Sequence, residues 1–262
     1  MLQEPRNVLH VSANTQPVFR ELGIDAEAIF DHPLIKPWRI LPERENCTLD
    51  ATLSDGRTIR WHVKRFNPVS GPESPAEEEI RGHELLINRQ IPTANLIGRG
   101  RTIDGKSFTI FEDLAGYSAA DKLVEAGIAF QTLLQPTADL AARLHAAGLH
   151  HRDLYLCHFF AKIDGKSVDV RLIDSARVRQ LPAFLTRTRW IIKDLAQFWY
   201  STTKLIVSDE QRIAWLDRYA QQRNSPSTIA LRRKIERKVA WIARHDVQLR
   251  KEQPSRNISI PK

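Results

Sequence analysis

The spacing of apolar residues changes along this 262-residue chain, and that change limits the folds open to it. Between residues 49 and 63, apolar and polar residues alternate on both sides of Asp55-Gly56, a dipeptide typical of tight turns. This alternation predicts two paired strands, because successive side chains of a strand point to opposite faces. One face of the second strand then carries four polar residues: Thr58, Arg60, His62 and Lys64.

A helix is predicted to follow this hairpin. Ser74 and Glu77 have the Ser-x-x-Glu spacing of a capping box, and Pro75 suits the first helical position. We expect the helix to reach about Gln90, before a proline-containing break. Two further short strands are predicted within residues 96–114, so strands and one helix dominate the first part of the chain.

Helical periodicity dominates after residue 114. Helices are predicted over four segments: Phe130–Ala147, Arg189–Leu205, Glu210–Gln222 and Ser227 to about Leu249. A second hairpin is predicted over residues 159–173, with its turn at Asp164-Gly165. The chain is therefore expected to be an α+β protein, with a strand-rich first part and a mainly helical second part.

Composition excludes several classes of protein. With 42% hydrophobic and 27% charged residues, the chain is ordinary for a globular protein and not disordered as a whole. Two cysteines, Cys47 and Cys157, are too few for a disulfide-rich scaffold or a multi-cysteine zinc module. No apolar run reaches the roughly 20 residues that span a bilayer, so we expect a soluble, cytoplasmic protein. The formal net charge of +8 favours an anionic partner.

Four charged residues occur in an order that suits phosphoryl transfer. Lys64 lies on a predicted strand and Glu79 on the helix after it, whereas Asp153 and Asp174 flank the second hairpin. The transition state of this reaction spreads negative charge over phosphate oxygens. Catalysis therefore requires a cationic side chain, a carboxylate that holds a metal ion and a carboxylate that orients the acceptor hydroxyl.

Each of these residues alone has a simpler interpretation. His151-Arg152-Asp153 could form only a surface salt bridge, and Lys64 beside Arg65 could belong to a solvated face. Glu79 is one of three consecutive glutamates near a helix start, where the helix dipole favours acids in any case. Only the ordered set favours a phosphotransferase.

Residues 151–159 read His-Arg-Asp-Leu-Tyr-Leu-Cys-His-Phe. This string resembles the catalytic loop of the lipopolysaccharide core sugar kinases, which are heptose and Kdo kinases with a protein-kinase-like fold. The resemblance covers roughly residues 38–245. Further similar segments are Val63-Lys64-Arg65, Glu79, Phe108–Leu114, Asp174 with Arg177, and Lys193–Ala196.

The resemblance implies a protein-kinase-like bilobal α+β fold. A small β-rich N-lobe with one helix would precede a larger, mainly helical C-lobe. The chain would then have four parts: an N-terminal extension at residues 1–37, the N-lobe at 38–114, the C-lobe at 115–251 and a flexible tail at 252–262.

The resemblance also implies phosphoryl transfer from ATP, with Mg²⁺, to a heptose or Kdo hydroxyl of the lipopolysaccharide inner core. Lys64 would grip the nucleotide phosphates and assist catalysis, and Glu79 would orient Lys64. Asp174 would bind Mg²⁺. Asp153 would be the catalytic residue that orients the acceptor hydroxyl or accepts its proton. The implied nucleotide site includes three further residues: Glu112, Leu114 and His158.

The chain departs from ordinary protein kinases in several places. No glycine-rich loop precedes Lys64, and Ser175-Ala176 follows Asp174 where those enzymes have Phe-Gly. His158 stands five residues after Asp153, in the place of a metal-binding asparagine. Neutral imidazole is a poor Mg²⁺ ligand, so we expect His158 to hydrogen-bond a phosphate or a carboxylate instead. By the same resemblance, Asp194 would brace the catalytic loop.

The predicted C-terminal helix is strongly basic. Its lysines and arginines either form a solvated face or attract a phosphorylated lipid or acidic bilayer surface. Nucleic-acid binding is a poor fit, because no interleaved aromatic residues accompany the charge. The buried side of the helix is predicted from five apolar residues: Ile229, Ile235, Val239, Ile242 and Val247. Four aromatic residues at helical spacing are predicted to form core: Trp190, Phe198, Trp199 and Tyr200.

The expected partner is therefore the lipopolysaccharide core glycolipid, with the protein in the cytoplasm or peripheral at the inner face of the cytoplasmic membrane. Two other functions stay open. The same fold could phosphorylate a protein or a small molecule, or it could serve as a non-catalytic, kinase-like binding module.

Overall fold

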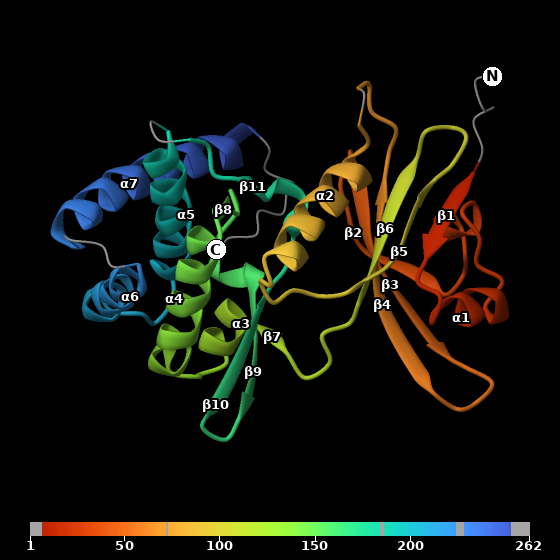
Figure 1. Ribbon diagram of the computed structural model, residues 1–262, viewed down its shortest axis with the longest axis horizontal. Coiled ribbons are helices and arrows are strands. Elements are labelled where there is room, and N and C mark those ends of the chain that lie inside the picture. The colour runs from red at the N-terminus through yellow and green to blue at the C-terminus, as the bar shows by residue number, and fades with distance from the viewer. Residues whose placement is uncertain (1–6, 72, 184–185, 224–227, 253–262) are drawn as a thin grey trace. The chain divides into compact units, whose positions relative to one another are not determined.

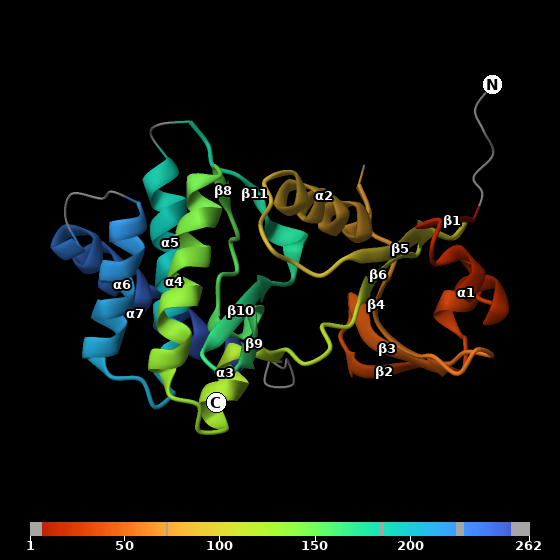
Figure 2. The same cartoon turned by 60° about the horizontal axis from the view of Figure 1, so that its bottom comes forward.

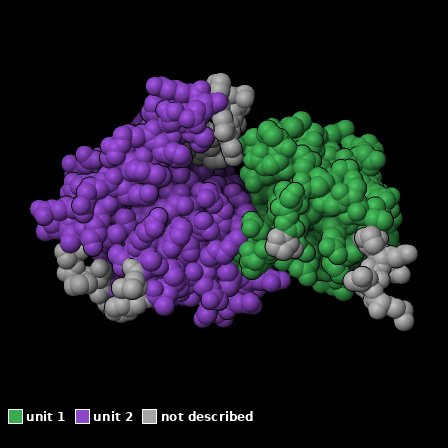
Figure 3. Space-filling view, turned by 90° about the horizontal axis from the view of Figure 1, so that it is seen from above, with its two compact units in different colours: residues 1–83, 94–113 green, residues 84–93, 114–262 purple. Residues whose placement is uncertain are grey.

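The computed structural model describes residues 7–71, 73–183, 186–223 and 228–252 (Figure 1). The chain divides into two compact units, residues 1–83 with 94–113 and residues 84–93 with 114–262 (Figure 3). Strands dominate the first unit and helices the second. The predicted α+β class, with a β-rich first part and a helical second part, is confirmed.

The first unit is built on an antiparallel sheet. Its strands are β1 (Val8–Val11), β2 (Ile35–Ile40), β3 (Arg44–Thr52), β4 (Thr58–Phe66), β5 (Leu96–Arg101) and β6 (Ser107–Glu112). The six strands follow the order β1-β5-β6-β4-β3-β2 (Figures 1 and 2). The predicted hairpin is β3–β4, in which Leu49 lies opposite Trp61 and both side chains are buried. Gly56 in its turn has a φ of 84°, a conformation that glycine adopts without strain.

Residues 8–37, predicted as an extension, contribute to this sheet and its core. Helix α1 (Gln16–Glu21) and a short 3-10 turn (Ala28–Phe30) follow β1. The ring of Phe19 stacks on that of Trp61 with centroids 5.0 Å apart. Gly100 permits the pairing of β1 with β5, because a Cβ there would lie 2.0 Å from the carbonyl oxygen of Val8.

Helix α2 (Pro75–Asn88) begins with the predicted capping box. The backbone N–H of Glu77 donates to Ser74 Oγ at 3.2 Å, and the N–H of Ser74 donates to Glu77 Oε2 at 2.7 Å. These two bonds satisfy donors that a helix start otherwise leaves unpaired. The helix belongs to the first unit as far as His83, and its last residues belong to the second.

The second unit is mainly helical. Its helices are α3 (Ala120–Glu125), α4 (Phe130–Ala146), α5 (Arg187–Thr202), α6 (Asp209–Gln222) and α7 (Thr228–Glu252), with 3-10 turns at Leu156–His158 and Ser175–Arg177. Its strands are β7 (Ser118–Ala119), β8 (Leu149–His150), β9 (Phe159–Asp164), β10 (Ser167–Leu172) and β11 (Arg179–Gln180). The strands form one three-stranded sheet, β10-β9-β7, and the pair β11-β8. The predicted second hairpin is β9–β10, and four helices match those predicted to within a few residues.

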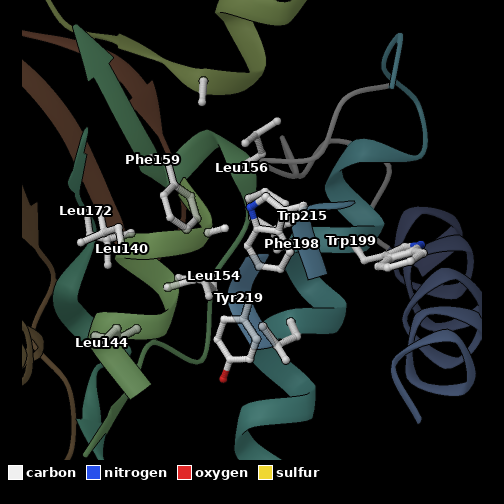
Figure 4. Packing of buried hydrophobic residues seen from close by; sticks show 14 of the residues in the cluster. Leu140, Leu144, Leu154, Leu156, Phe159, Leu172, Phe198, Trp199, Trp215 and Tyr219 are labelled. Carbon is white, nitrogen blue, oxygen red and sulfur yellow. The ribbon is translucent and has the colours of Figure 1, made fainter. Parts of the chain in front are cut away.

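The core of the second unit lies where α4 packs on α6 and where α5 packs on α7 (Figure 4). Phe198 stacks on Trp215 with ring centroids 3.9 Å apart. The indole N–H of Trp215 donates to Thr137 Oγ1 at 3.0 Å, so this buried polar group is satisfied. Three of the four predicted core aromatics are buried: Phe198, Trp199 and Tyr200. Trp190 is only partly buried.

Helix α7 buries Ile235 and Ile242, as predicted. The prediction was wrong for Ile229 and Val247, whose side chains are exposed because they lie outside the arc that faces the core. Of the predicted flexible tail, Glu252 ends α7, and residues 253–262 lie outside the described residues. None of the helices in the described part of the chain has both the length and the apolar character needed to cross a bilayer.

Candidate active site

Lys64 and Glu79 form an ion pair inside the first unit. The ammonium of Lys64 on β4 donates to Glu79 Oε1 on α2, and Thr109 Oγ1 donates to Glu79 Oε2 at 2.9 Å. Their side chains are 19% and 1% exposed, respectively. Arg65 is also buried, and its Nε donates to the carbonyl oxygen of Ile29 at 2.6 Å. Lys64 and Arg65 therefore do not form a solvated face, which was the simpler interpretation of these two residues.

A buried carboxylate, Asp194 on α5, holds the start of the loop that carries Asp153. The backbone N–H of His151 donates to Asp194 Oδ2 at 2.7 Å, and that of Arg152 to Oδ1 at 2.8 Å. His145 Nε2 lies 3.2 Å from Asp194 Oδ2. Burial disfavours the ionised carboxylate, but the hydrogen bonds from the His145 ring and the His151 N–H outweigh it and lower the pKa of Asp194.

Two more residues on the same face of α5 continue this brace. The side-chain oxygen of Gln197 accepts from the N–H of Leu154 at 3.3 Å, and its amide donates to the carbonyl oxygen of Arg152 at 2.9 Å. Ser201 Oγ accepts from the N–H of Leu156 at 2.9 Å. The i, i+3 and i+7 spacing of these side chains brings them to one side of a helix. The loop backbone is thereby fixed from residue 151 to residue 156.

The carboxylate of Asp153 lies at the centre of this loop and is 22% exposed. Arg177 Nη1 donates to both of its oxygens, at 3.2 and 3.3 Å. Arg152 and Asp174 have positive φ values of 68° and 62°, and only one other non-glycine residue in the described ranges does. Such strained backbone persists where its surroundings enforce it, which is typical of functional sites.

His158 links Asp153 to Asp174. Its Nδ1 lies 2.6 Å from the backbone carbonyl oxygen of Asp153, and its Nε2 lies 3.7 Å from Asp174 Oδ2. Burial disfavours the charged ring, yet the Cys157 side chain, the Asp174 carboxylate and the Asp153 carbonyl raise the pKa of His158 to about 10. A protonated imidazole has no lone pair for a metal ion. The ring of His158 faces the Asp174 carboxylate at an ion-pair distance, and its expected hydrogen bond to a phosphate or carboxylate stays a prediction.

The two predicted nucleotide-site residues at the end of β6 and just after it belong to different units. Glu112 ends β6 in the first unit, and its Oε1 accepts from the N–H of Asn95 at 2.9 Å. Leu114 is buried in the second unit, where its carbonyl oxygen accepts from the N–H of Tyr117 at 2.9 Å. The chain thus crosses from one unit to the other between these two residues.

The residues present fit a Mg²⁺ ion that is bound together with a nucleotide. The described part of the chain has no group of three or more His, Cys, Asp or Glu side chains placed to hold a metal ion. Mg²⁺ in phosphotransfer sites needs no such cage, because one or two carboxylates and the substrate phosphates bind it. Asp174, 24% exposed, supplies oxygen atoms of the required kind.

A strand-rich unit with a buried Lys–Glu pair and a helical unit with a braced aspartate loop define a kinase-like α+β protein. The chain belongs to the lipopolysaccharide kinase (Kdo/WaaP) family, which it matches over residues 78–240. This segment contains Glu79, Asp153 and Asp174, and it begins after Lys64.

The relatives that carry the name lipopolysaccharide core heptose(I) kinase WaaP include the following two proteins. The protein of Escherichia coli K12 is 27% identical over 175 residues, which is 61% of this chain and 64% of that protein. The protein of Pseudomonas aeruginosa is 32% identical over 93 residues, or 34% of each chain. Among solved structures, the pseudokinase domain of BIR2, an immune regulator of the RLK/Pelle family, aligns with a TM-score of 0.47 and 14% identity, over 90% of this chain and 82% of that one. The match to the two WaaP proteins covers less than two thirds of the length of either.

The sequence did not single out every residue of this site. Gln197 was not predicted to brace the loop, and Arg177 was not predicted to bind the Asp153 carboxylate. The signal for Gln197 was present, because Asp194, Gln197 and Ser201 share the i, i+3, i+7 spacing of one helix face.

Proposed function

We propose that this protein transfers the terminal phosphoryl group of ATP to a hydroxyl of a heptose or Kdo sugar in the lipopolysaccharide inner core. Membership of the lipopolysaccharide kinase family supports the class of reaction. The heptose(I) kinase names of the two relatives support the class of acceptor. The observation that carries the proposal is the braced loop: Asp194 holds its backbone, Arg177 holds the Asp153 carboxylate, and His158 lies between the backbone carbonyl oxygen of Asp153 and the carboxylate of Asp174.

In the second unit, Asp153 is the proposed catalytic residue. Its carboxylate orients the acceptor hydroxyl and takes its proton as the acceptor oxygen bonds to phosphorus and ADP leaves. Arg177 and Gln197 hold this carboxylate and the loop that carries it. Asp174 is the proposed Mg²⁺ ligand, with His158 as its neighbour. Mg²⁺, when bound, neutralises charge on the phosphate oxygens.

In the first unit, Lys64 is the proposed phosphate-binding cation. Its ion pair with Glu79 fixes the ammonium group, and Thr109 holds the far side of the Glu79 carboxylate. A fixed cation does not have to reorganise during the reaction. It can therefore stabilise the negative charge that spreads over the phosphate oxygens. Glu112 and Leu114 are proposed to contribute to the nucleotide site.

Radiolabelled ATP and a set of truncated core glycolipids test the proposal. With Mg²⁺ present, label is expected in a glycolipid that carries the acceptor sugar and not in lipid A alone. Comparison of a heptose-containing core with a Kdo-only core assigns the acceptor. Label that enters a protein or small-molecule acceptor but no glycolipid would favour the second function instead. A melting temperature that Mg²⁺-ATP does not raise, together with no transfer, would favour a non-catalytic module.

The outer face of α7 is proposed to bind an anionic membrane surface. This face carries eight exposed basic and apolar residues: Ile229, Arg233, Lys234, Arg237, Trp241, Arg244, Val247 and Lys251. The exposed acids of α7 are Glu236, which pairs with Arg232, and Glu252 near the end of the helix. The acidic Asp246 lies on the other side of the helix, buried, with Tyr200 Oη donating to it at 2.8 Å. Basic residues with an exposed tryptophan suit the interface of an acidic bilayer, where the glycolipid acceptor resides.

Co-sedimentation with vesicles tests this surface. The triple variant Arg233→Gln, Arg237→Gln, Arg244→Gln is expected to bind phosphatidylglycerol-containing vesicles about 100-fold more weakly, at about 1 kcal/mol per basic residue. The control removes three exposed lysines elsewhere in the second unit: Lys122→Gln, Lys162→Gln and Lys166→Gln. Equal losses in the two variants, or equal binding to neutral phosphatidylcholine vesicles, would contradict the proposal.

A further inference from the structure

Three cations surround the ring of Trp190, at the start of α5. The guanidinium carbon of Arg152 lies 4.9 Å from the ring centroid, the ammonium of Lys193 lies 5.5 Å from it and the guanidinium carbon of Arg189 lies 5.9 Å from it. The imidazole of His150 packs on the same ring at 4.7 Å, and burial lowers its pKa to about 4. This ring is therefore not the simple core residue that its helical spacing predicts.

The carboxylates beside this cluster are already engaged. Asp194 accepts from the backbone N–H groups of His151 and Arg152, and both oxygens of Asp153 accept from Arg177. The Nε of Arg152 is buried and has no hydrogen-bond partner within the described ranges. The cluster thus gathers more positive charge than its carboxylates balance, and a buried donor without an acceptor is costly.

The pKa of Lys193 is consistent with this excess of positive charge. Burial lowers its pKa, and the nearby positive charges of Arg177 and Arg152 lower it further, to about 8, against the opposite influence of Asp153 and Asp194. The geometry agrees, because Lys193 and Arg152 share the ring of Trp190, and Arg177 binds the carboxylate of Asp153, the residue that follows Arg152. An anion placed among these cations would relieve their repulsion.

We propose that Arg152, Arg177 and Lys193 form a subsite beside Asp153 that binds an anionic substituent, a phosphate or a carboxylate, on the acceptor. The inference rests on the proposed function and deepens it, since it defines the acceptor as an anionic sugar and not a neutral one. Arginine binds such groups through paired N–H donors, and lysine adds a compact charge. The Arg177 side chain is 52% exposed, so the subsite is open to a ligand. Binding there sets the distance between the anionic group and the hydroxyl that Asp153 serves.

Calorimetric titration without ATP tests the subsite independently of phosphoryl transfer. The probes are mannose 6-phosphate, mannose and inorganic phosphate. Saturable binding of mannose 6-phosphate is expected, with none of mannose. Lys193→Met is expected to weaken it by about tenfold, whereas Lys193→Arg restores it to within about threefold. The matched control is Lys166→Met, which removes an exposed lysine from the β9–β10 turn of the same unit.

The outcomes separate this inference from the proposed function. Unchanged binding in Lys193→Met, or binding of inorganic phosphate but not of the sugar phosphate, would overturn the subsite. Competition of Mg²⁺-ATP with mannose 6-phosphate would also overturn it, because the cations would then serve the nucleotide. Lysine-dependent binding without any phosphoryl transfer would sustain the subsite and reject the kinase.

Enzyme kinetics and fluorescence distinguish a binding role of Lys193 from a merely structural one. If the glycolipid is phosphorylated, Lys193→Met should raise KM for the acceptor by about tenfold and leave KM for ATP unchanged. Sugar-phosphate binding should also change the fluorescence of the wild-type protein, and Trp190→Phe should abolish that change. An unaltered KM for the acceptor, with a normal melting temperature, would reject the assignment.

Discussion

Asp153→Asn is expected to lower kcat for phosphoryl transfer by about 10²- to 10⁴-fold, the range for loss of a positioned general base. The amide has nearly the shape of the carboxylate, so the hydrogen bonds that brace the loop through Asp194 and Gln197 remain possible. What the variant loses is the negative charge that orients the acceptor hydroxyl and takes its proton. Initial rates at saturating ATP and acceptor measure the effect directly.

Two comparisons make this result specific to catalysis. The rise in melting temperature with Mg²⁺-ATP should be the same for Asp153→Asn and the wild type, because Lys64 and Asp174 are unchanged. Asp164→Asn removes an exposed carboxylate from the β9–β10 hairpin and should leave kcat as it is. Near-wild-type turnover of Asp153→Asn would show that the proposed role of Asp153 is wrong.

Local signals account for the parts of the fold that the sequence predicted. The β3–β4 hairpin follows from strict alternation around Asp55-Gly56, and the start of α2 follows from Ser74 and Glu77. Both depend on residues close together in the chain, for which the physical rules are strong. Parts that depend on distant partners were not predicted. Strand β1 is four residues long, and its pairing with β5 requires Gly100, some ninety residues later.

The candidate site shows the same division. Residue type and order predicted the four charged residues Lys64, Glu79, Asp153 and Asp174. In the structure Lys64 pairs with Glu79 in one unit, and His158 lies beside Asp174 in the other. The left-handed backbone of Arg152 and Asp174 could not be predicted, because neither residue type requires it. It arises from the hydrogen bonds of the surrounding loop, which the tertiary fold supplies.

Trp190 and the outer face of α7 show where periodicity misleads. Helical spacing assigns apolar residues to a core, yet it cannot report which neighbours a face will meet. Trp190 meets Arg152, Lys193 and Arg189, and Ile229 and Val247 meet solvent. In both places an apolar residue lies among basic ones, which is not the composition of a core.

Asp194→Asn is expected to reduce the free energy of unfolding of the second unit by about 3 to 5 kcal/mol, the cost of breaking a buried charged partnership. Both oxygens of Asp194 accept hydrogen bonds from N–H groups, those of His151 and Arg152, and His145 approaches one of them. An asparagine side chain has only one oxygen, so its NH₂ group would face one of these backbone N–H donors. The variant would therefore leave a buried backbone N–H without an acceptor and lose the charge as well.

Urea unfolding followed by helical circular dichroism, which α3–α7 dominate, measures this loss. The matched control is Asp139→Asn, which breaks the partly exposed pair with Arg218 at 2.6 Å and should cost no more than about 1 kcal/mol. If Asp194 braces the Asp153 loop, its variant should lose transfer activity at temperatures where its helices are still folded, because the loop detaches before the core melts. A variant with full activity, or one no less stable than Asp139→Asn, would mean that the loop holds its shape without the buried carboxylate.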